Sequence, residues 1–529
     1  MRGMRETRET PNTAEASFVE RPIWHRLTVG FLAVTTLLRL AQLPTMELAG
    51  DEAYYWDWSR HLALGYYDQG PLIAYIIRIT TAIFGTNEFG VRVGVCMASL
   101  GPLIACGVLA RRLFSPLAGF LTVLLLAVTP LMEVGSIIAT YDPLLVVFWA
   151  WAIVFLERAL FSPDASTQNR SWMLAGVMTG FGFLAKHTML LLAPCLILFL
   201  FASAEHRKWL VRPQPYIAFG IVLLMYSGVF YWNYHHHWWT FGHLFFLTTK
   251  TFGTPLSRFG DYLGGQALLL SPILFFALLW ACRGARKSKV GLFLVCMGLP
   301  VFAFFCLMSL KSKVQANWSP FAWLSLTVLL SGVVASRFAD FQGRAWEIFK
   351  GKKGLLTSSI TVTSLLLTIL AVSPQLRYRL GIRLSILADQ SNTTYGWRET
   401  AQYVQKVRQE LEREGKPIFL CTNGYQYAAL MGFYLPDHPE IHDMFLHFRL
   451  TMYAAHVERL RSHLGENALY LNENRVEDPY LREIFERVEW AEPYPIWRRP
   501  YYDVPIRTIQ LARGYNYRRY TGLEWAEGG

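Results

Sequence analysis

Long apolar segments alternate with short polar ones along residues 24–373 of this 529-residue chain. A helix needs about 20 mostly apolar residues to cross the hydrocarbon core of a bilayer. Eleven segments meet or approach that length, and we predict a membrane-spanning helix in each. They are 24–44, 89–110, 116–132, 142–156, 172–185, 188–203, 214–232, 262–281, 290–309, 319–336 and 355–373.

The C-terminal part has a different pattern and predicts a small α/β domain over 374–529. Residues 397–414 place apolar side chains on one helical face, and a second helix fits 425–435. Short strands fit 418–421, 468–472 and 504–511. Neither part contains an internal repeat.

Composition agrees with a polytopic α-helical membrane protein. Hydrophobic residues make up 53% and charged residues 17%, against about 25% charged in typical soluble domains. This balance excludes disordered, collagen-like and coiled-coil chains. The seven cysteines include no C-x-x-C pair, so they give no sign of a zinc or redox site.

The distribution of charge predicts the orientation in the membrane. The net charge of +12 arises entirely before residue 374, because 374–529 carries 20 basic and 20 acidic residues. With the N-terminus in the cytoplasm, 20 Lys and Arg lie in inside segments and seven in the opposite loops, as the positive-inside rule requires. We therefore predict a cytoplasmic tail over 1–23, an uncleaved first span, and an outside domain over 374–529.

The first outward loop, 45–88, contains two amphipathic stretches that we expect to lie as helices in the membrane interface. The first, 50–60, has Asp51 and Glu52 at its start, and the second covers 71–84. The two carboxylates have two interpretations. They either cap the helix and complement its dipole, or they do chemistry at the outer surface.

A third outward carboxylate, Asp142, lies at the mouth of the fourth span in Thr140-Tyr141-Asp142-Pro143. Ionisable residues at membrane depth are costly and usually functional. The structural alternative is an N-cap ahead of Pro143.

The remaining outward loops carry histidines and cations. Residues 235–243 contain four histidines, of which His237 and His243 are candidate metal ligands; the alternative is that these residues favour the interface because they are amphipathic. No cofactor is firmly predicted, and a divalent metal is left open. Lys186, Lys311 and Lys313 oppose the orientation rule, which indicates either a phosphate-bearing partner or anchoring to lipid headgroups.

Several of these motifs together resemble the polyprenyl-phosphate-sugar glycosyltransferases, the bacterial protein mannosyltransferase and aminoarabinose transferase type. The motifs are Asp51-Glu52-Ala53-Tyr54-Tyr55-Trp56, Gly65-Tyr66-Tyr67-Asp68, Thr140-Tyr141-Asp142-Pro143, Ala185-Lys186-His187-Thr188, Trp232-Asn233 and Gln315-Ala316-Asn317-Trp318. The resemblance implies a C-type glycosyltransferase fold over 24–373 in a bacterial inner membrane, with the site facing the periplasm. One departure is Gln69-Gly70, where relatives carry Lys or His after the Asp that aligns with Asp68.

The resemblance also implies a reaction. A sugar on a polyprenyl phosphate would pass to an envelope glycan, to lipid A or its core, or to a protein, with inversion. Asp51 would act as the base, and Glu52 and Asp142 would orient the acceptor or Asp51. The expected substrate-binding residues are Tyr55, Arg60, Asp68, Lys186, His187, Asn233, Arg258, Lys311, Lys313 and Asn317.

Two other functions are compatible with the same spans. A transporter or flippase of lipid-linked sugars would share the cationic loops without needing a base, and broken helices or inverted repeats would favour it. A non-catalytic assembly subunit would be indicated if Asp51 proved dispensable.

Overall fold

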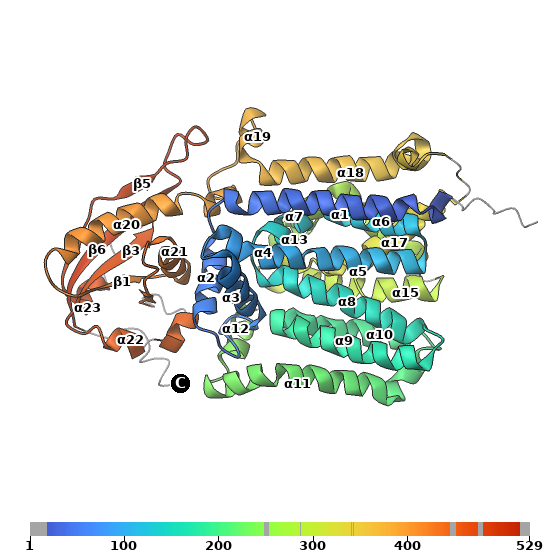
Figure 1. The fold of residues 1–529 in the computed structure, drawn as a ribbon, viewed down its shortest axis with the longest axis horizontal. Coiled ribbons are helices and arrows are strands. Elements are labelled where there is room, and N and C mark those ends of the chain that lie inside the picture. Colours follow the sequence, from blue (N-terminus) through green and yellow to red (C-terminus); the bar gives the residue numbers. More distant parts are fainter. Residues whose placement is uncertain are drawn as a thin grey trace, which may run out of the picture.

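The protein is described by a computed structural model that covers residues 18–247, 253–285, 287–339, 341, 343–444, 451–456, 458–473 and 480–518. Most of the predicted N-terminal tail, and Lys250 of the outward loops, lie outside these residues. A bundle of long helices forms one half of the molecule and the C-terminal α/β domain forms the other (Figure 1).

The long bundle helices run along a common direction (Figure 1). The helices before the C-terminal domain are α1 (Ile23–Gln42), α2 (Gly50–Arg60), α3 (Leu72–Phe84), α4 (Glu88–Ala98), α5 (Leu100–Leu113), α6 (Pro116–Ala127), α7 (Pro130–Ile137), α8 (Tyr141–Phe161), α9 (Ala165–Ala185), α10 (Leu192–Ala202), α11 (Pro213–His235), α12 (Trp239–Leu247), α13 (Pro255–Leu270), α14 (Pro272–Ala285), α15 (Lys289–Cys296), α16 (Leu299–Lys311), α17 (Ala322–Ser336), α18 (Gly351–Val372) and α19 (Pro374–Arg379).

All eleven predicted spans coincide with helical segments. By length and composition, six of the described helices are long and apolar enough to cross a membrane, or up to eight if each bent pair counts as one span. Three shorter apolar helices, 72–84, 187–202 and 322–336, accompany them. The number eleven therefore stays a prediction, although each of these segments is mostly helical.

Two of the predicted spans are sharply broken at prolines. The axes of α6 and α7 meet at 68°, and those of α13 and α14 meet at 101°. Pro130 and Pro272 begin the second helix of each pair. Because proline has no N–H and its ring clashes with the preceding turn, it ends one helix and can start the next.

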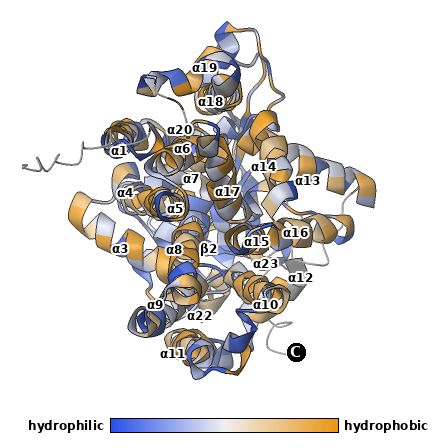
Figure 2. Cartoon of the chain, turned by 90° about the vertical axis from the view of Figure 1, so that its right-hand side faces the viewer, coloured by the Kyte–Doolittle hydropathy of each residue, from blue (hydrophilic) through white to orange (hydrophobic). Residues whose placement is uncertain are grey.

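The surface of the bundle is apolar, as a lipid-facing surface requires. Figure 2, a view along the bundle, shows hydrophobic residues on the outer helices as well as between them. Leu37 is 66% exposed and Leu224 is 74% exposed, exposures that leave large apolar side chains without protein neighbours. Together with the long apolar helices, this surface identifies a multi-pass membrane protein.

The C-terminal domain is a mixed six-stranded sheet with helices on it. Its strands are β1 (Ile418–Thr422), β2 (Ile441–Asp443), β3 (Asn467–Glu473), β4 (Phe485–Trp490), β5 (Tyr494–Ile496) and β6 (Arg507–Tyr517). The strand order is β2-β1-β3-β6-β4, and β5 also pairs with β6. The pairs β1–β2 and β1–β3 are parallel, and β6 is antiparallel to its neighbours. The helices are α20 (Trp397–Glu412), α21 (Tyr425–Tyr434), α22 (Glu458–Arg461) and α23 (Leu481–Ile484).

The predicted elements of this domain are present, but β2, β4 and β5 were not predicted. The last predicted strand, 504–511, is shifted to Arg507–Tyr517. The missed strands are short or lie at sheet edges, and their alternation is weak, as in β4, where most side chains are exposed or half-buried. Whether such a segment forms a strand depends on pairing with a neighbouring strand more than on its own sequence pattern.

One hydrophobic core joins the first loop to the C-terminal domain. Buried side chains of α2 and α3 belong to the same cluster as those of α20, α21 and β3. In Figure 1, α2 and α3 lie between the bundle and the sheet. The helix α2 is therefore buried on most sides, including Tyr55 and Trp58, and is not the half-exposed interfacial helix that its pattern predicts.

Candidate functional site

Asp51 is the second residue of α2, at the end of the bundle that meets the C-terminal domain. Its Oδ1 accepts hydrogen bonds from Gln426 Nε2 (2.8 Å) and from the Tyr425 hydroxyl (3.3 Å), both on α21. The capping interpretation is confirmed for Glu52, whose Oε2 accepts from the N–H of the N-cap residue Ala49 at 2.9 Å, and is wrong for Asp51. Both acidic side chains lie in the first turn, where they complement the helix dipole.

Glu52 is fully buried and forms an ion pair with the equally buried Arg92 on α4. Arg92 Nε and Nη2 each donate to one Glu52 oxygen at 2.7 Å, and the other Arg92 donors reach backbone carbonyls between α1 and α2. Glu52 Oε1 also accepts from Ala139 N at 2.8 Å. Both oxygens of the Glu52 carboxylate therefore connect α2, α4 and the start of α8. In this conformation Glu52 stabilises the fold and has no oxygen left to orient a substrate.

Asp142 lies at the start of α8 and forms an ion pair with Lys186, which follows α9. Its capping alternative finds no support, since the cap position is Thr140 and no side chain caps this helix end. The buried Lys186 ammonium also lies 5.0 Å from the Tyr141 ring centre and 5.9 Å from that of Trp318. Such aromatic walls hold a cation in place.

A pair of tyrosines, Tyr55 and Tyr141, lies near three carboxylates. The rings of Tyr55 and Tyr141 are 5.4 Å apart, and Asp51, Asp68 and Asp142 all act electrostatically on Tyr141. Burial, and then the neighbouring acidic groups, raise the pKa of Tyr55 well above its usual value. The Tyr55 phenol therefore stays protonated and can serve as a hydrogen-bond donor.

Asp68 approaches one of the two candidate metal ligands. Its Oδ1 lies 3.5 Å from His243 Nε2, and its Oδ2 accepts from the Tyr54 hydroxyl at 2.9 Å. His237 is exposed on the preceding turn. Among the described residues no group of three His, Cys, Asp or Glu side chains could hold a metal. Catalytic zinc takes three protein ligands, so these two side chains do not complete such a site and we assign no step to a metal.

An apolar cavity of about 160 Å³ opens beside Asp142. Its walls come from α5, α7 and α8, and Asp142 and Asn317 are among its few polar lining groups. Leu131, Met132 and Val146 are representative of the remaining walls. A mostly apolar cleft with a few converging polar groups is the usual form of a ligand site.

The cationic loop 311–317 lies next to this cavity. Lys311, Lys313 and Asn317 are exposed, and neither lysine makes an ion pair with any described residue. Arg258 is buried and donates to the carbonyl of Gly253, just ahead of α13, and to those of Ser309 and Leu310 near the end of α16. Arg258 therefore supports the lysine loop, and its predicted contact with phosphate finds no support in this conformation.

Three other predicted binding residues are used in internal contacts. Arg60 donates to the carbonyl of His438 at 2.9 Å and so docks the C-terminal domain. Asn233 is fully buried and connects α11 to α12 by accepting from Thr240 N at 3.1 Å. His187 bonds through one ring nitrogen to Gln69 Oε1 at 2.9 Å and through the other to the Tyr226 hydroxyl.

The departure at Gln69-Gly70 has a packing reason. Gln69 is buried and committed to His187. A Cβ at position 70 would lie 2.1 Å from the backbone oxygen of Leu184, so only glycine fits against α9. Position 69 therefore holds a buried amide in contact with His187, where the resemblance led us to expect a cation.

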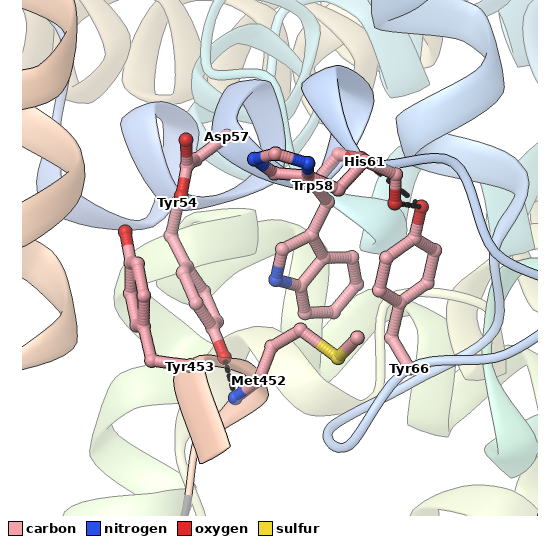
Figure 3. A pocket seen from close by; sticks show the side chains of 7 residues that line it. All are labelled: Tyr54, Asp57, Trp58, His61, Tyr66, Met452 and Tyr453. Atoms are coloured by element: carbon pink, nitrogen blue, oxygen red, sulfur yellow. Dashed lines mark hydrogen bonds between the residues drawn. The ribbon is translucent and has the colours of Figure 1, made fainter. Parts of the chain in front are cut away.

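A second, very small pocket marks the seam between α2 and the C-terminal domain. Figure 3 shows its lining, with Tyr54, Asp57, Trp58, His61 and Tyr66 on one side and Met452 and Tyr453 on the other. Its volume is about 10 Å³, roughly that of one water molecule. The Tyr54 hydroxyl accepts from Met452 N at 2.7 Å. Burial, only partly offset by Arg60, raises the pKa of Asp57. The seam is thus closely packed and leaves no room for a sugar.

Comparisons with known proteins agree with this fold. Residues 68–232 match the family model described as dolichyl-phosphate-mannose-protein mannosyltransferase. The chain is 31% identical over 296 residues to the lipid A galacturonosyltransferase of Rhizobium johnstonii, covering 53% of this chain and 59% of that protein. It is 29% identical over 188 residues to the undecaprenyl phosphate-alpha-4-amino-4-deoxy-L-arabinose arabinosyl transferase of Pseudomonas aeruginosa, covering 35% of this chain and 33% of that one. The chain thus spans about a third to three fifths of these relatives.

The solved structures define the fold over almost the whole chain. The crystal structure of ArnT from Cupriavidus metallidurans bound to undecaprenyl phosphate matches with a TM-score of 0.63 at 15% identity, covering 92% of this chain and 97% of that one. The protein is therefore a multi-pass membrane protein with the C-type glycosyltransferase fold. Its predicted resemblance to the polyprenyl-phosphate-sugar glycosyltransferases is confirmed by the family model and by both relatives.

Three residues that contact the proposed catalytic carboxylates were not identified from the sequence. Arg92 had a usable signal, because a charge inside a predicted span normally has a partner. Gln426 and Tyr425 had none, since they reach Asp51 across 375 and 374 residues of chain. They come from a domain that the sequence presents as a separate unit.

Proposed function

We propose that this protein is a glycosyltransferase that moves a sugar from a polyprenyl-phosphate donor to a lipid A-type acceptor at the outer face of a bacterial inner membrane. The observation that carries the proposal is that Asp142, paired with Lys186, lines an apolar cavity. The neighbouring Tyr141 ring contacts Tyr55 on α2, the helix that carries Asp51. The names of the relatives, which include transferases to lipid A and users of undecaprenyl phosphate, support the same substrates.

In the proposed reaction the donor lies with its isoprenoid chain in the apolar cavity and its phosphate toward the lysine loop. Asp142 and Asn317 line that cavity, and Lys311 and Lys313 are exposed on the loop that leads to Asn317. Positive charge placed where the phosphate negative charge grows stabilises the transition state. Lys186 would add to this if it exchanged its partner Asp142 for the phosphate.

The chemical step is a direct displacement at the anomeric carbon. Asp51 takes the proton of the acceptor hydroxyl while the new C–O bond forms and the bond to the phosphate oxygen breaks. The electron pair leaves on the polyprenyl phosphate, which is a good leaving group and needs no general acid. A single displacement inverts the anomeric configuration. A base within hydrogen-bond reach contributes about 10²–10⁴-fold to the rate.

The structure has one feature that a transporter would also have, but the fold match favours a glycosyltransferase. The broken pairs α6–α7 and α13–α14 are of the kind that transporters use. The fold match to ArnT, however, covers 92% of the chain, and those breaks lie within a glycosyltransferase fold. We therefore do not favour a flippase.

The test has a cellular and a biochemical arm. Envelope lipids of a deletion strain should lack one sugar mass, and the wild-type gene should restore it. The purified protein should then transfer that sugar from an undecaprenyl-phosphate donor to the lipids of the deletion strain. Transfer from a nucleotide sugar alone, or movement of the donor across vesicles without transfer, would contradict the proposal.

A further inference from the structure

The C-terminal domain reaches into the proposed catalytic centre through one helix. In Figure 1, α21 lies against α2 on the side away from the bundle. Gln426 Nε2 donates to Asp51 Oδ1 at 2.8 Å, and the Tyr425 hydroxyl donates to the same oxygen at 3.3 Å. The other oxygen, Oδ2, accepts no hydrogen bond from the residues for which the structure gives positions.

A glycine next to Asp51 makes this approach possible. A Cβ at Gly50 would lie 2.7 Å from Cβ of Gln426 and 2.9 Å from its Cγ, closer than nonbonded carbon atoms can approach. The backbone of Gly50 does not need glycine for its conformation, since it has no positive φ. Position 50 must lack a side chain because Gln426 packs directly over the start of α2.

We propose that Gln426 is a positioning residue for the base, so that the C-terminal domain completes the active site. By holding Oδ1, Gln426 fixes the plane of the carboxylate and leaves Oδ2 to take the acceptor proton. The O–H bond forms on Oδ2 as the acceptor O–H bond breaks, and Gln426 keeps both of its own amide protons. This inference rests on the proposed function of Asp51 as base.

The first experiment removes the donor and keeps the shape. Gln426→Met retains an unbranched side chain of similar length without an N–H group. Because misplacing a catalytic group by about 1 Å can cost on the order of 10²-fold, we expect kcat to fall about 10- to 100-fold. KM for the polyprenyl-phosphate donor should change less than about twofold, since Gln426 does not reach the donor cavity.

A second variant disturbs the contact between Gln426 and Asp51 by a change in α2. Gly50→Ala keeps both Gln426 and Asp51 in the sequence, but its new Cβ displaces Gln426, together with the part of α21 that carries it, away from the carboxylate. Alanine favours a helix more than glycine does, so a loss of kcat in this variant cannot be attributed to a weakened α2. Normal kcat in Gln426→Met would overturn the inference, whatever the result for Gly50→Ala.

Tyr434→Phe is the matched control, because it removes a contact of α21 at the same seam without touching Asp51. The Tyr434 hydroxyl accepts from Leu48 N at 2.6 Å and donates to Glu88 at 3.0 Å. We expect a lower melting temperature with kcat within about twofold of wild type. If Tyr434→Phe loses as much kcat as Gln426→Met, domain docking and not the hydrogen bond is responsible, and the inference is wrong.

A double-variant cycle separates this inference from the proposed function. In an Asp51→Asn background, Gln426→Met should change the residual rate less than about twofold, since there is no base left to orient. A full additional loss would overturn the positioning role. An active Asp51→Asn protein would instead overturn the role of Asp51 itself. A silent Gln426→Met beside an inactive Asp51→Asn would overturn only the role of Gln426.

Discussion

Replacing Asp51 by Asn separates chemistry from structure at the proposed base. In Asp51→Asn the amide oxygen can still accept from Gln426 and Tyr425, as Oδ1 does now. The amide nitrogen takes the place of Oδ2, which receives no hydrogen bond from the described residues. The cap of α2 is unaffected, because Glu52 provides it. The free energy of unfolding should therefore change by less than about 0.5 kcal/mol.

The rate should respond very differently. An amide cannot take the acceptor proton, so the contribution of the base, about 10²–10⁴-fold, is lost. At about 1.4 kcal/mol per factor of ten, this is about 3–5 kcal/mol of transition-state stabilisation. Asp51→Ala should lose the same rate and also about 1–2 kcal/mol of stability, because the two α21 donors lose a charged acceptor.

The assay is the initial rate of sugar transfer from an undecaprenyl-phosphate donor, measured by mass spectrometry on purified protein, with melting curves in the same detergent. Wild type and the two variants are compared at saturating donor. An Asp51→Asn protein with normal rate and normal melting temperature would refute the assignment of the base. Asp142 would then be the next candidate, since it is the carboxylate that lines the donor cavity.

Three further predictions concern the donor, the orientation and the framework. Replacing Lys311 and Lys313 together by Ala should raise KM for the donor while the melting temperature stays unchanged, because both side chains are exposed and make no ion pair with described residues; unchanged donor dependence would exclude them from phosphate binding. A reporter fused after Leu380 should be active only outside the cytoplasm, and a cytoplasmic result would place the site on the wrong side of the membrane. Arg92→Met should destabilise the protein by about 3–5 kcal/mol, since it leaves the fully buried Glu52 charge unpaired; adding Glu52→Gln should restore much of that loss in thermal unfolding.

The local elements of this protein follow from its sequence to a large extent. In lipid, a long apolar segment must satisfy its backbone hydrogen bonds internally, and a helix is the way for a single segment to do so. All eleven apolar segments are accordingly helical. The helices 50–60 and 72–84 of the first loop, and α20, β1 and α21 of the C-terminal domain, also lie close to where their patterns predict them. The motifs that resemble the glycosyltransferases pointed to the right fold because their order along the chain is specific.

The tertiary structure alone decided which partner each of these residues has. Glu52 and Asp51 are neighbours in one motif, yet Glu52 is used up by Arg92, and Asp51 meets Gln426 from another domain. Asn233 and Arg258 likewise hold helix ends together, although their place in the outward loops suggested substrate contacts. A hydrogen bond or an ion pair depends on distances of a few tenths of an ångström between segments far apart in the chain. No local pattern encodes such distances, because they arise only when the helices and the C-terminal domain pack together.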